Sequence, residues 1–369
     1  MGITGKLASL QRMATLAITS ALCSTTTDVL DLHADVLLVE LLLNKICHRA
    51  FLWLASLAPA HPLQMLVYTC AKRYIKSHRS PLHELANMYN VAPQDIEIIA
   101  PPSHPPGHQW KHKMTIHDTA EESAACARSC RSELVLYSDG SGLGGHTGMA
   151  AIMYKARQCL KVLKLHLGSL EDHTMYEVEA VRLSLVLHLL SMERGIRSAT
   201  IMLDNQSVIQ SLGYRKLRTT QYLVSGLLSQ FDSIFRWSRH LDFELDIAWV
   251  KGHMDIEGNE LVDKAVKEAA GGKSSKVTSL PSLLATNPLP VSVSAHKQAY
   301  GASLHKRWKE IWKQSLRHAR ITKIYPSLPS NKFWKLMVEH SRAQASLVIQ
   351  LRTGHVPLNV YLHRISKLE

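Results

Sequence analysis

Four acidic residues lie where a folded chain could bring them to one site. Asp139 and Asp204 each follow a short apolar run that predicts a β-strand, and Glu179 and Asp263 lie in segments that predict helices. Carboxylate oxygens and water are the ligands that Mg²⁺ prefers in proteins. Two such ions about 4 Å apart can activate a water and stabilise the leaving oxygen of a phosphoryl displacement. The four acids therefore predict a divalent-metal site that acts on phosphodiesters.

Strand ends and helix faces are rigid enough to hold such acids together. If the strands before Asp139 and Asp204 are parallel neighbours, both acids lie at the same edge of the sheet. Taken singly, each acid has a plainer explanation. Asp139 before Gly140 suits a turn, and Asp204 suits a helix cap. Glu179 suits a solvated helix face, and Asp263 suits an acid in a first helical turn that interacts with the helix dipole. The metal site is favoured only when the four are taken together.

Two glutamates compete for the position on the first helix. Glu177 and Glu179 both lie near the start of a helix that we predict from residue 175 to about residue 193. Glu179 shares a helix face with Leu183 and Val186 of the apolar stripe, so we expect it to point inward. Glu179 is therefore the predicted ligand, and Glu177 is the weaker candidate.

The acids occur within longer motifs in a fixed order. Asp139 is followed by Gly140-Ser141-Gly142, Glu179 follows Thr174-Met175-Tyr176, and Asp263 follows Trp249-Val250-Lys251-Gly252-His253. Across residues 132–271 this order resembles the type 1 ribonuclease H domain, in the variant found in the reverse transcriptases of fungal-type non-LTR retrotransposons.

The resemblance implies a fold and an activity. The fold is α/β and ribonuclease H-like: a mixed five-stranded sheet, three antiparallel plus two parallel strands, with helices on both faces. The activity is a metal-dependent endonuclease that hydrolyses the RNA strand of RNA–DNA hybrids, leaving a 3′-hydroxyl and a 5′-phosphate. The implied cofactor is a pair of Mg²⁺ ions, with Mn²⁺ as an alternative, and the implied metal ligands are Asp139, Glu179, Asp204 and Asp263.

His253 is implied to assist catalysis by proton transfer or product release, since a histidine near a scissile phosphate can do either at neutral pH. Backbone amides after Asp139 suit a phosphate or sugar, and a basic run before the central helix suits a phosphate backbone. A hairpin connection and a solvated face explain the same residues more plainly. The predicted nucleic-acid contacts are Gly140, Ser141, Gly142, Asn205, Gln206, Arg215, Lys216, Arg218 and Asn259.

The spacing of apolar residues predicts three strands, a helix, a strand, two helices, a strand and a last helix. The Gly-rich segment 140–148 is predicted to be the first turn. The predicted strands cover residues 133–138, 148–154, 159–167, 199–203 and 245–250. The predicted helices cover residues 175–193, 219–237 and 257–270, with a short helix from Gln206.

Pro-, Gly- and Ser-rich stretches predict the division of the chain into domains. The predicted parts are a helical segment at 1–105, a linker at 106–131, the nuclease domain at 132–271, a linker at 272–294 and a helical C-terminal segment at 295–369. In the last of these, Trp308 and Trp312 lie on a basic amphipathic helix, and we expect them to be packed rather than stacked on bases.

The flanks also resemble retrotransposon proteins. Thr26–Leu30 and Lys45–Ala50 are similar to the region after a polymerase core, and Gln350–Asn359 is similar to the segment before a zinc knuckle. The polymerase core is absent, and no Cys follows Cys159 to build a knuckle. The chain therefore resembles a truncated retroelement protein.

The chain is strongly basic, with a formal net charge of +13 and a pI near 9.5. This charge favours a polyanionic partner, and a basic surface suits a nucleic-acid backbone. The apolar runs are short and interrupted by polar residues, so they predict neither a secretory signal nor a membrane span. We expect an intracellular protein of the nucleus or cytoplasm with no membrane partner.

Two alternatives to a hybrid nuclease stay open. One is a catalytically silent retroelement remnant that keeps the fold and binds nucleic acid without turnover. The other is a related nuclease of the same superfamily that acts on DNA. The presence of all four acids and His253 argues against the first, and the spacing from Trp249 to Asp263 argues against the second.

Overall fold

A computed structural model describes the chain except residues 1, 73–76, 78–79, 90, 101–112, 116–118, 157, 170, 205–218, 239–241, 251–256, 286–288, 325, 327–334, 336, 357 and 365–369. The chain separates into two units, one formed by residues 51–298 and the other by residues 1–50 with residues 299–369.

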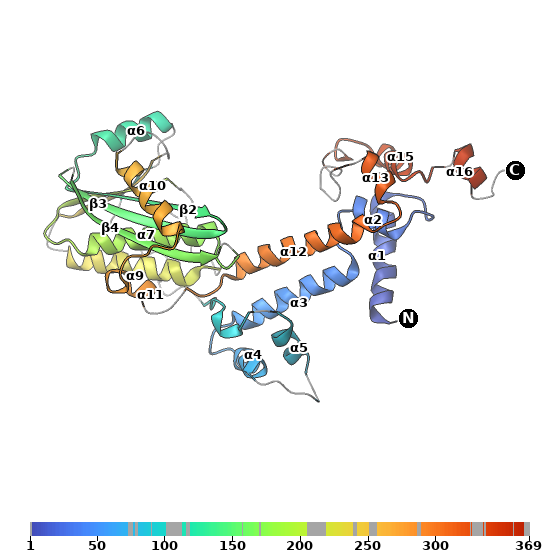
Figure 1. Cartoon of the computed structure of the whole chain (residues 1–369), viewed down its shortest axis with the longest axis horizontal. Coiled ribbons are helices and arrows are strands. Elements are labelled where there is room, and N and C mark those ends of the chain that lie inside the picture. Colours follow the sequence, from blue (N-terminus) through green and yellow to red (C-terminus); the bar gives the residue numbers. More distant parts are fainter. Residues whose placement is uncertain are drawn as a thin grey trace. The chain divides into compact units, whose positions relative to one another are not determined.

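The unit of residues 51–298 contains a mixed sheet (Figure 1). Its strands β2 (Leu134–Leu143), β3 (His146–Lys155) and β4 (Gln158–Ser169) are antiparallel neighbours. β5 (Ser198–Leu203) pairs in parallel with β2, and β6 (Glu244–Trp249) pairs in parallel with β5. These five strands confirm the predicted ribonuclease H-like arrangement of three antiparallel and two parallel strands.

A sixth strand, β1 (Lys113–Thr115), pairs in parallel with β6 and completes the order β1-β6-β5-β2-β3-β4. It lies in the stretch predicted as a linker, because a strand of three residues is too short to show alternation. The helix α6 (Ala120–Ser129) follows in the same stretch and begins at Thr119, whose side chain accepts a hydrogen bond from the backbone N–H of Glu122. Such a cap satisfies one of the free donors at the helix start.

Successive side chains of a strand point to opposite faces of the sheet. Leu134 and Leu136 of β2 pack with α7 (Met175–Ser191) and α9 (Gln221–Trp237) in the main core. Tyr137 faces the other way and packs in a second core with α10 (Glu257–Ala270) and α6. Figure 1 shows α10 and α7 on opposite sides of the strands. The helices predicted at 175–193, 219–237 and 257–270 are confirmed.

The first hairpin differs from its prediction. Residues 140–148 were predicted to be a turn, but β2 runs to Leu143 and β3 starts at His146. Only Gly144 and Gly145 lie between them, with φ of 61° and 82°. Two successive positive φ values allow a two-residue connection that matches the twist of the strands, so the strands are longer than predicted. The short helix predicted from Gln206 lies outside the described residues.

Residues 51–100 belong to the same unit as the sheet. Their helices are the end of α3 (Val39–Ala55), α4 (Pro62–Lys72) and α5 (Pro81–Met88), which share a core of their own. The Glu97 side chain is fully buried and accepts hydrogen bonds from the backbone N–H groups of Thr220 (2.6 Å) and Val293 (2.9 Å). The predicted domain boundaries themselves stay a proposal.

The second unit is helical and has its own core. Its further helices are α1 (Ile3–Thr19), α2 (Thr27–His33), α12 (Val293–Lys313, shared with the sheet unit), α13 (His318–Ile324), α15 (Arg342–Thr353) and α16 (Asn359–Arg364). Trp308 and Trp312 are buried among Val29, Leu32 and Leu41, which confirms that these aromatic residues are packed. Across the described part of the chain, no helix has the length and apolar character needed to cross a membrane.

Candidate active site

The sheet places Asp139 and Asp204 side by side. The parallel register of β2 and β5 pairs Tyr137 with Met202. Asp139 and Asp204 each come two residues later along the chain, Asp139 within β2 and Asp204 directly after the last residue of β5. The parallel pairing of β2 with β5 confirms that the two predicted strands are neighbours. Asp139 was expected to end its strand, but β2 continues to Leu143.

Helix α7 supplies the third acid. The helix begins at a capping box, in which the Thr174 hydroxyl accepts from the backbone N–H of Glu177 and the Glu177 side chain accepts from the backbone N–H of Thr174. The Glu177 side chain therefore stabilises the start of α7 through hydrogen bonds. Glu179 lies half a turn further on, and only 8% of its side chain is exposed. The structure brings Glu179 together with Asp139 and Asp204.

Arg182 joins these three acids. Its Nη1 donates to Oε2 of Glu179 and its Nη2 donates to Oδ1 of Asp204, each at 2.6 Å. The same Nη2 lies 3.7 Å from Oδ1 of Asp139 and donates to the carbonyl oxygen of Ser138 at 2.6 Å. The Arg182 side chain is only 1% exposed. Charge-assisted hydrogen bonds of this kind are short and strong, so the guanidinium links α7, β2 and the end of β5.

The charges of this cluster act on one another. Burial raises the pKa of the Asp139 carboxyl above its ordinary value; Asp204 and Asp263 add to this rise, and Arg182 opposes it. Burial by itself lowers the pKa of Arg182, but Glu179, Asp204 and Asp139 outweigh burial and raise it. The guanidinium is therefore charged and compensates part of the negative charge of the acids.

Two glycines allow the helices to come close to Asp139. A Cβ at Gly140 would lie 2.8 Å from Cγ1 of Val178 and 2.9 Å from Cδ of Arg182, so α7 rests directly on the backbone of β2. A Cβ at Gly258 would overlap the ring of Tyr137, so the first turn of α10 rests on the side chain two residues before Asp139. Gly140, predicted to contact nucleic acid, has this packing role as well.

Asp263 lies on α10, close enough to Asp139 to raise its pKa. Its Oδ2 accepts from Nζ of Lys267 at 2.7 Å, and its side chain is 32% exposed. The backbone of Asp204 is held by a further hydrogen bond, which Nε1 of Trp249 donates to its carbonyl oxygen at 3.0 Å. The fourth acid thus acts on Asp139 but is paired with a lysine rather than with Arg182.

Many of the predicted substrate contacts cannot be placed. His253, Asn205, Gln206, Arg215, Lys216 and Arg218 lie outside the described residues, and so does the side chain of Asn259. Ser141 is half-buried and Gly142 is exposed on β2, next to Asp139. Their role as nucleic-acid contacts stays a prediction.

The acids are suited to a divalent cation in their chemistry, because Mg²⁺ prefers carboxylate oxygens. In the structure as it stands, the cation among them is the guanidinium of Arg182. Over the ranges described, no three His, Cys, Asp or Glu side chains form a ligand set ready for a metal ion. The oxygens of Glu179 and Asp204 that accept from Arg182 would have to give up those hydrogen bonds to bind a cation.

Arg182 is the site residue that the sequence analysis missed. Thirteen residues of α7 are buried, and Arg182 is one of them. A charged residue in a helix with so little exposed surface needs charged partners. The signal was therefore present: an arginine within the apolar stripe, three residues after Glu179, which places the two side chains on the same face.

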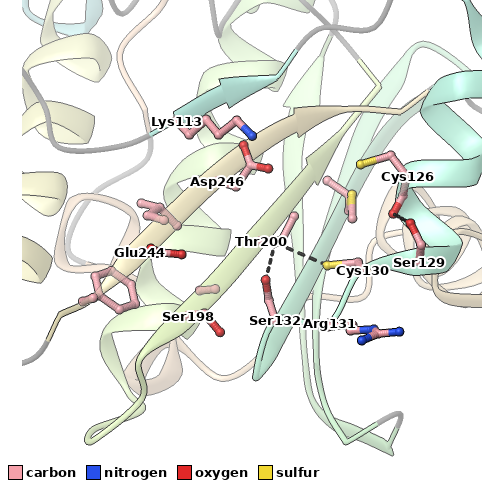
Figure 2. A pocket seen from close by; sticks show the side chains of 14 residues that line it. Lys113, Cys126, Ser129, Cys130, Arg131, Ser132, Ser198, Thr200, Glu244 and Asp246 are labelled. Atoms are coloured by element: carbon pink, nitrogen blue, oxygen red, sulfur yellow. Dashed lines mark hydrogen bonds between the residues drawn. The ribbon is translucent and has the colours of Figure 1, made fainter.

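A separate hollow of about 740 Å³ lies at the other ends of the parallel strands. It is lined by Ser198 and Glu244, the first residues of β5 and β6, and by Cys126 of α6. Figure 2 shows Cys130 and Ser132 reaching Thr200, with hydrogen bonds of 3.4 Å and 2.7 Å. Since Asp204 follows the last residue of β5, this hollow is not part of the acid cluster.

Comparison with known proteins gives a family for part of the chain. Residues 131–271 match the RNase H family, and this stretch contains all four acids and Arg182. A comparison with curated proteins finds no match. Residues 131–271 are thus similar to a ribonuclease H domain, and the predicted limits of 132–271 stay a proposal.

Solved structures similar to this chain include three ribonucleases H. The N-terminal ribonuclease H domain of a Mycobacterium tuberculosis protein, fused to maltose-binding protein, is 19% identical, over 38% of this chain and 94% of that chain, with a TM-score of 0.29. Ribonuclease H1 of Halobacterium salinarum NRC-1 is 17% identical, over 38% and 98%, with a TM-score of 0.28. LC11 ribonuclease H1, solved with an RNA/DNA hybrid, is 17% identical, over 37% and 96%, with a TM-score of 0.28.

Proposed function

We propose that this protein hydrolyses the RNA strand of RNA–DNA hybrids in a metal-dependent reaction. The observation that carries the proposal is the meeting of Asp139, Glu179 and Asp204 at one point of a domain that matches the ribonuclease H family. A carboxylate cluster at the end of parallel strands is suited to phosphodiester hydrolysis, because such a reaction needs cations held close to the scissile phosphate.

In this proposal Asp139, Glu179, Asp204 and Asp263 hold two Mg²⁺ ions, or Mn²⁺ in their place. Such ions, when bound, supply a nucleophilic water and neutralise the charge on the leaving oxygen. The chain contributes rigidity, since Asp139 lies in β2, Asp204 directly follows the paired strand β5, and Trp249 donates a hydrogen bond to the backbone of Asp204. Pre-set positions of this kind lower the cost of reaching the reactive geometry.

Further residues are proposed to serve the substrate. His253 moves a proton or helps release the product, and the backbone after Asp139 at Gly140-Ser141-Gly142 lies against the phosphates or sugars. The basic segment with Arg215, Lys216 and Arg218 follows the nucleic-acid backbone, with Asn205, Gln206 and Asn259 nearby. The net charge of +13 supports a polyanionic partner.

A retroelement origin is part of the same proposal. It rests on the likeness of Thr26–Leu30, Lys45–Ala50 and Gln350–Asn359 to segments that flank the polymerase and the zinc knuckle in non-LTR retrotransposon proteins. Isolation of a full-length transcript would test it. A reading frame that joins this sequence to a reverse transcriptase core supports the origin, and a frame with an unrelated neighbouring domain contradicts it.

The activity is tested with the full chain and three end-labelled substrates: an RNA–DNA hybrid, duplex DNA and duplex RNA. We expect cleavage of the RNA in the hybrid with Mg²⁺ and none with chelator. Asp204→Asn should lose cleavage and keep hybrid binding, since it removes one charge from the cluster. Asp242→Asn is the matched control, because Asp242 is exposed and precedes β6. Preferred cleavage of duplex DNA would identify the other superfamily nuclease instead.

The position of Arg182 favours a second candidate function, a domain that binds hybrid without cutting it. A guanidinium that already neutralises three carboxylates gives the cluster a structural use that needs no metal. Hybrid binding without cleavage, at Mg²⁺ and Mn²⁺ concentrations up to the millimolar range, would establish this function in place of the nuclease.

A further inference from the structure

We propose that Arg182 is a built-in counter-ion of the acid site, and that a divalent cation and its guanidinium compete for the same carboxylates. The inference deepens the proposed function, because it rests on the assignment of Asp139, Glu179 and Asp204 as metal ligands. It concerns the regulation of that site by a residue of the chain itself.

The contacts show that Arg182 uses the oxygens that a metal would need. Oε2 of Glu179 and Oδ1 of Asp204 each lie 2.6 Å from its terminal nitrogens, and Oδ1 of Asp139 lies 3.7 Å from one of them. Mg²⁺ binds oxygen at about 2.0–2.1 Å and demands near-octahedral geometry. A carboxylate oxygen that already accepts a short charge-assisted hydrogen bond is therefore a poorer ligand until that bond is given up.

Charge repulsion acts in the same direction. A guanidinium stays protonated in proteins, and with 1% exposure the side chain is shielded from water. Water therefore screens the repulsion between this guanidinium and a divalent cation held by the same acids less than it screens two fully exposed charges. Binding of the metal thus requires that the guanidinium withdraw from at least part of the cluster.

The remaining contacts of Arg182 show how it is held. Its Nη2 donates to the carbonyl oxygen of Ser138. Its Cδ packs against Gly140 so closely that a Cβ there would lie 2.9 Å from it. Its Nε is buried without a hydrogen-bond partner in the described part of the chain. The side chain is thus anchored by its terminal nitrogens, and the acids are its main partners. Without metal, Arg182 keeps the acids together; with metal, it raises the concentration at which the site fills.

The test is a Mn²⁺ titration of the full chain, followed by electron paramagnetic resonance of the free ion. Arg182→Met keeps an unbranched apolar stem and removes the guanidinium. We expect Arg182→Met to bind Mn²⁺ at least about tenfold more tightly than the wild type, because the guanidinium and the cation compete for the same carboxylates and couplings of this size are typical. The gain should vanish when Asp204→Asn is added. Arg197→Met is the matched control, since Arg197 is exposed and precedes the opposite end of β5.

A second variant covers the case in which Arg182→Met does not fold. Arg182→Lys keeps the positive charge but replaces the planar fork with a single ammonium, which cannot reach three carboxylates in the same way. Its affinity for Mn²⁺ should lie between those of the wild type and Arg182→Met. Equal affinity in the wild type and in the folded Arg182 variants overturns the inference. Hybrid cleavage is scored separately, so failure of the nuclease proposal and failure of the competition are distinguishable.

Discussion

Glu179 and Arg182 are three residues apart on α7, and Oε2 of Glu179 accepts a 2.6 Å hydrogen bond from Nη1 of Arg182. The helix alone sets this pair, because residues three apart are neighbours on its surface. The contact from Arg182 to Asp204 is different, since it joins residues from separate elements. It exists only when α7 packs on the sheet beside β5, so the contact between Arg182 and Asp204 depends on the folding of both elements.

Removal of the guanidinium should destabilise the protein in the absence of metal. Arg182→Met leaves Glu179 and its neighbours as carboxylates without their buried counter-ion, and the loss of one partner of a buried ionic group costs about 3–5 kcal/mol. Urea denaturation measures this change in the free energy of unfolding. The exposed Arg197→Met should change it by no more than about 0.5 kcal/mol. Equal effects of the two variants would show that Arg182 is not a structural counter-ion.

The stability should depend on pH through Glu177. Burial raises its pKa from the ordinary value of 4.5 to about 7, and the nearby Glu97 carboxylate adds to this rise. Its Oε1 is buried without a partner among the described residues. Between these two pKa values, the folded chain holds a proton that the unfolded chain has lost. This contribution to the free energy of unfolding therefore falls as the pH rises from about 4.5 to about 7, and is constant above that.

Glu177→Gln removes the titrating group and keeps the acceptor of the capping box. We expect its free energy of unfolding to fall less steeply than that of the wild type between pH 5 and pH 7. Urea denaturation at several pH values provides the two profiles. Parallel profiles of the wild type and Glu177→Gln would mean that Glu177 does not take up a proton in the folded state over this range.

The close approach of α7 to β2 should be sensitive to one methyl group. Gly140→Ala places a Cβ 2.8 Å from Cγ1 of Val178 and 2.9 Å from Cδ of Arg182. Overpacking of this kind typically costs about 1–3 kcal/mol, measured by urea denaturation. Gly301→Ala is the control, because a Cβ there meets nothing within 4 Å. As a helical glycine, Gly301 should give a small gain on replacement. A neutral Gly140→Ala would contradict the packing described for this site.

Much of the fold could be predicted because its signals are local. The short apolar runs before Asp139 and Asp204 mark β2 and β5, and the apolar content of Met175–Ser191 marks α7. The strand β1 could not be predicted, since three residues pair with β6 only through tertiary contacts. The order of the acids along the chain indicated which residues would meet, and the parallel register of β2 with β5 then brought Asp139 beside Asp204.

The cation at the centre of the acids was not predicted, for a physical reason. Helix α7 is buried on nearly all sides, so its sequence marks Arg182 as a charge that needs partners but does not show which acids they are. Which acids an interior arginine joins depends on how α7 packs against β2 and β5, and that information is not local. The charge of Arg182 required a partner, but only the packed structure shows that the partners are Glu179, Asp204 and Asp139.

The central claim is that Asp139 and its neighbouring acids cut RNA in a hybrid with the help of metal. The most direct measurement is cleavage of an RNA-labelled RNA–DNA hybrid by the full chain, with Mg²⁺ and with chelator, beside Asp139→Asn. We predict RNA cleavage that requires the metal and is lost in the variant, while hybrid binding persists. A folded wild-type protein that binds the hybrid and leaves its RNA intact at all metal concentrations would contradict this claim.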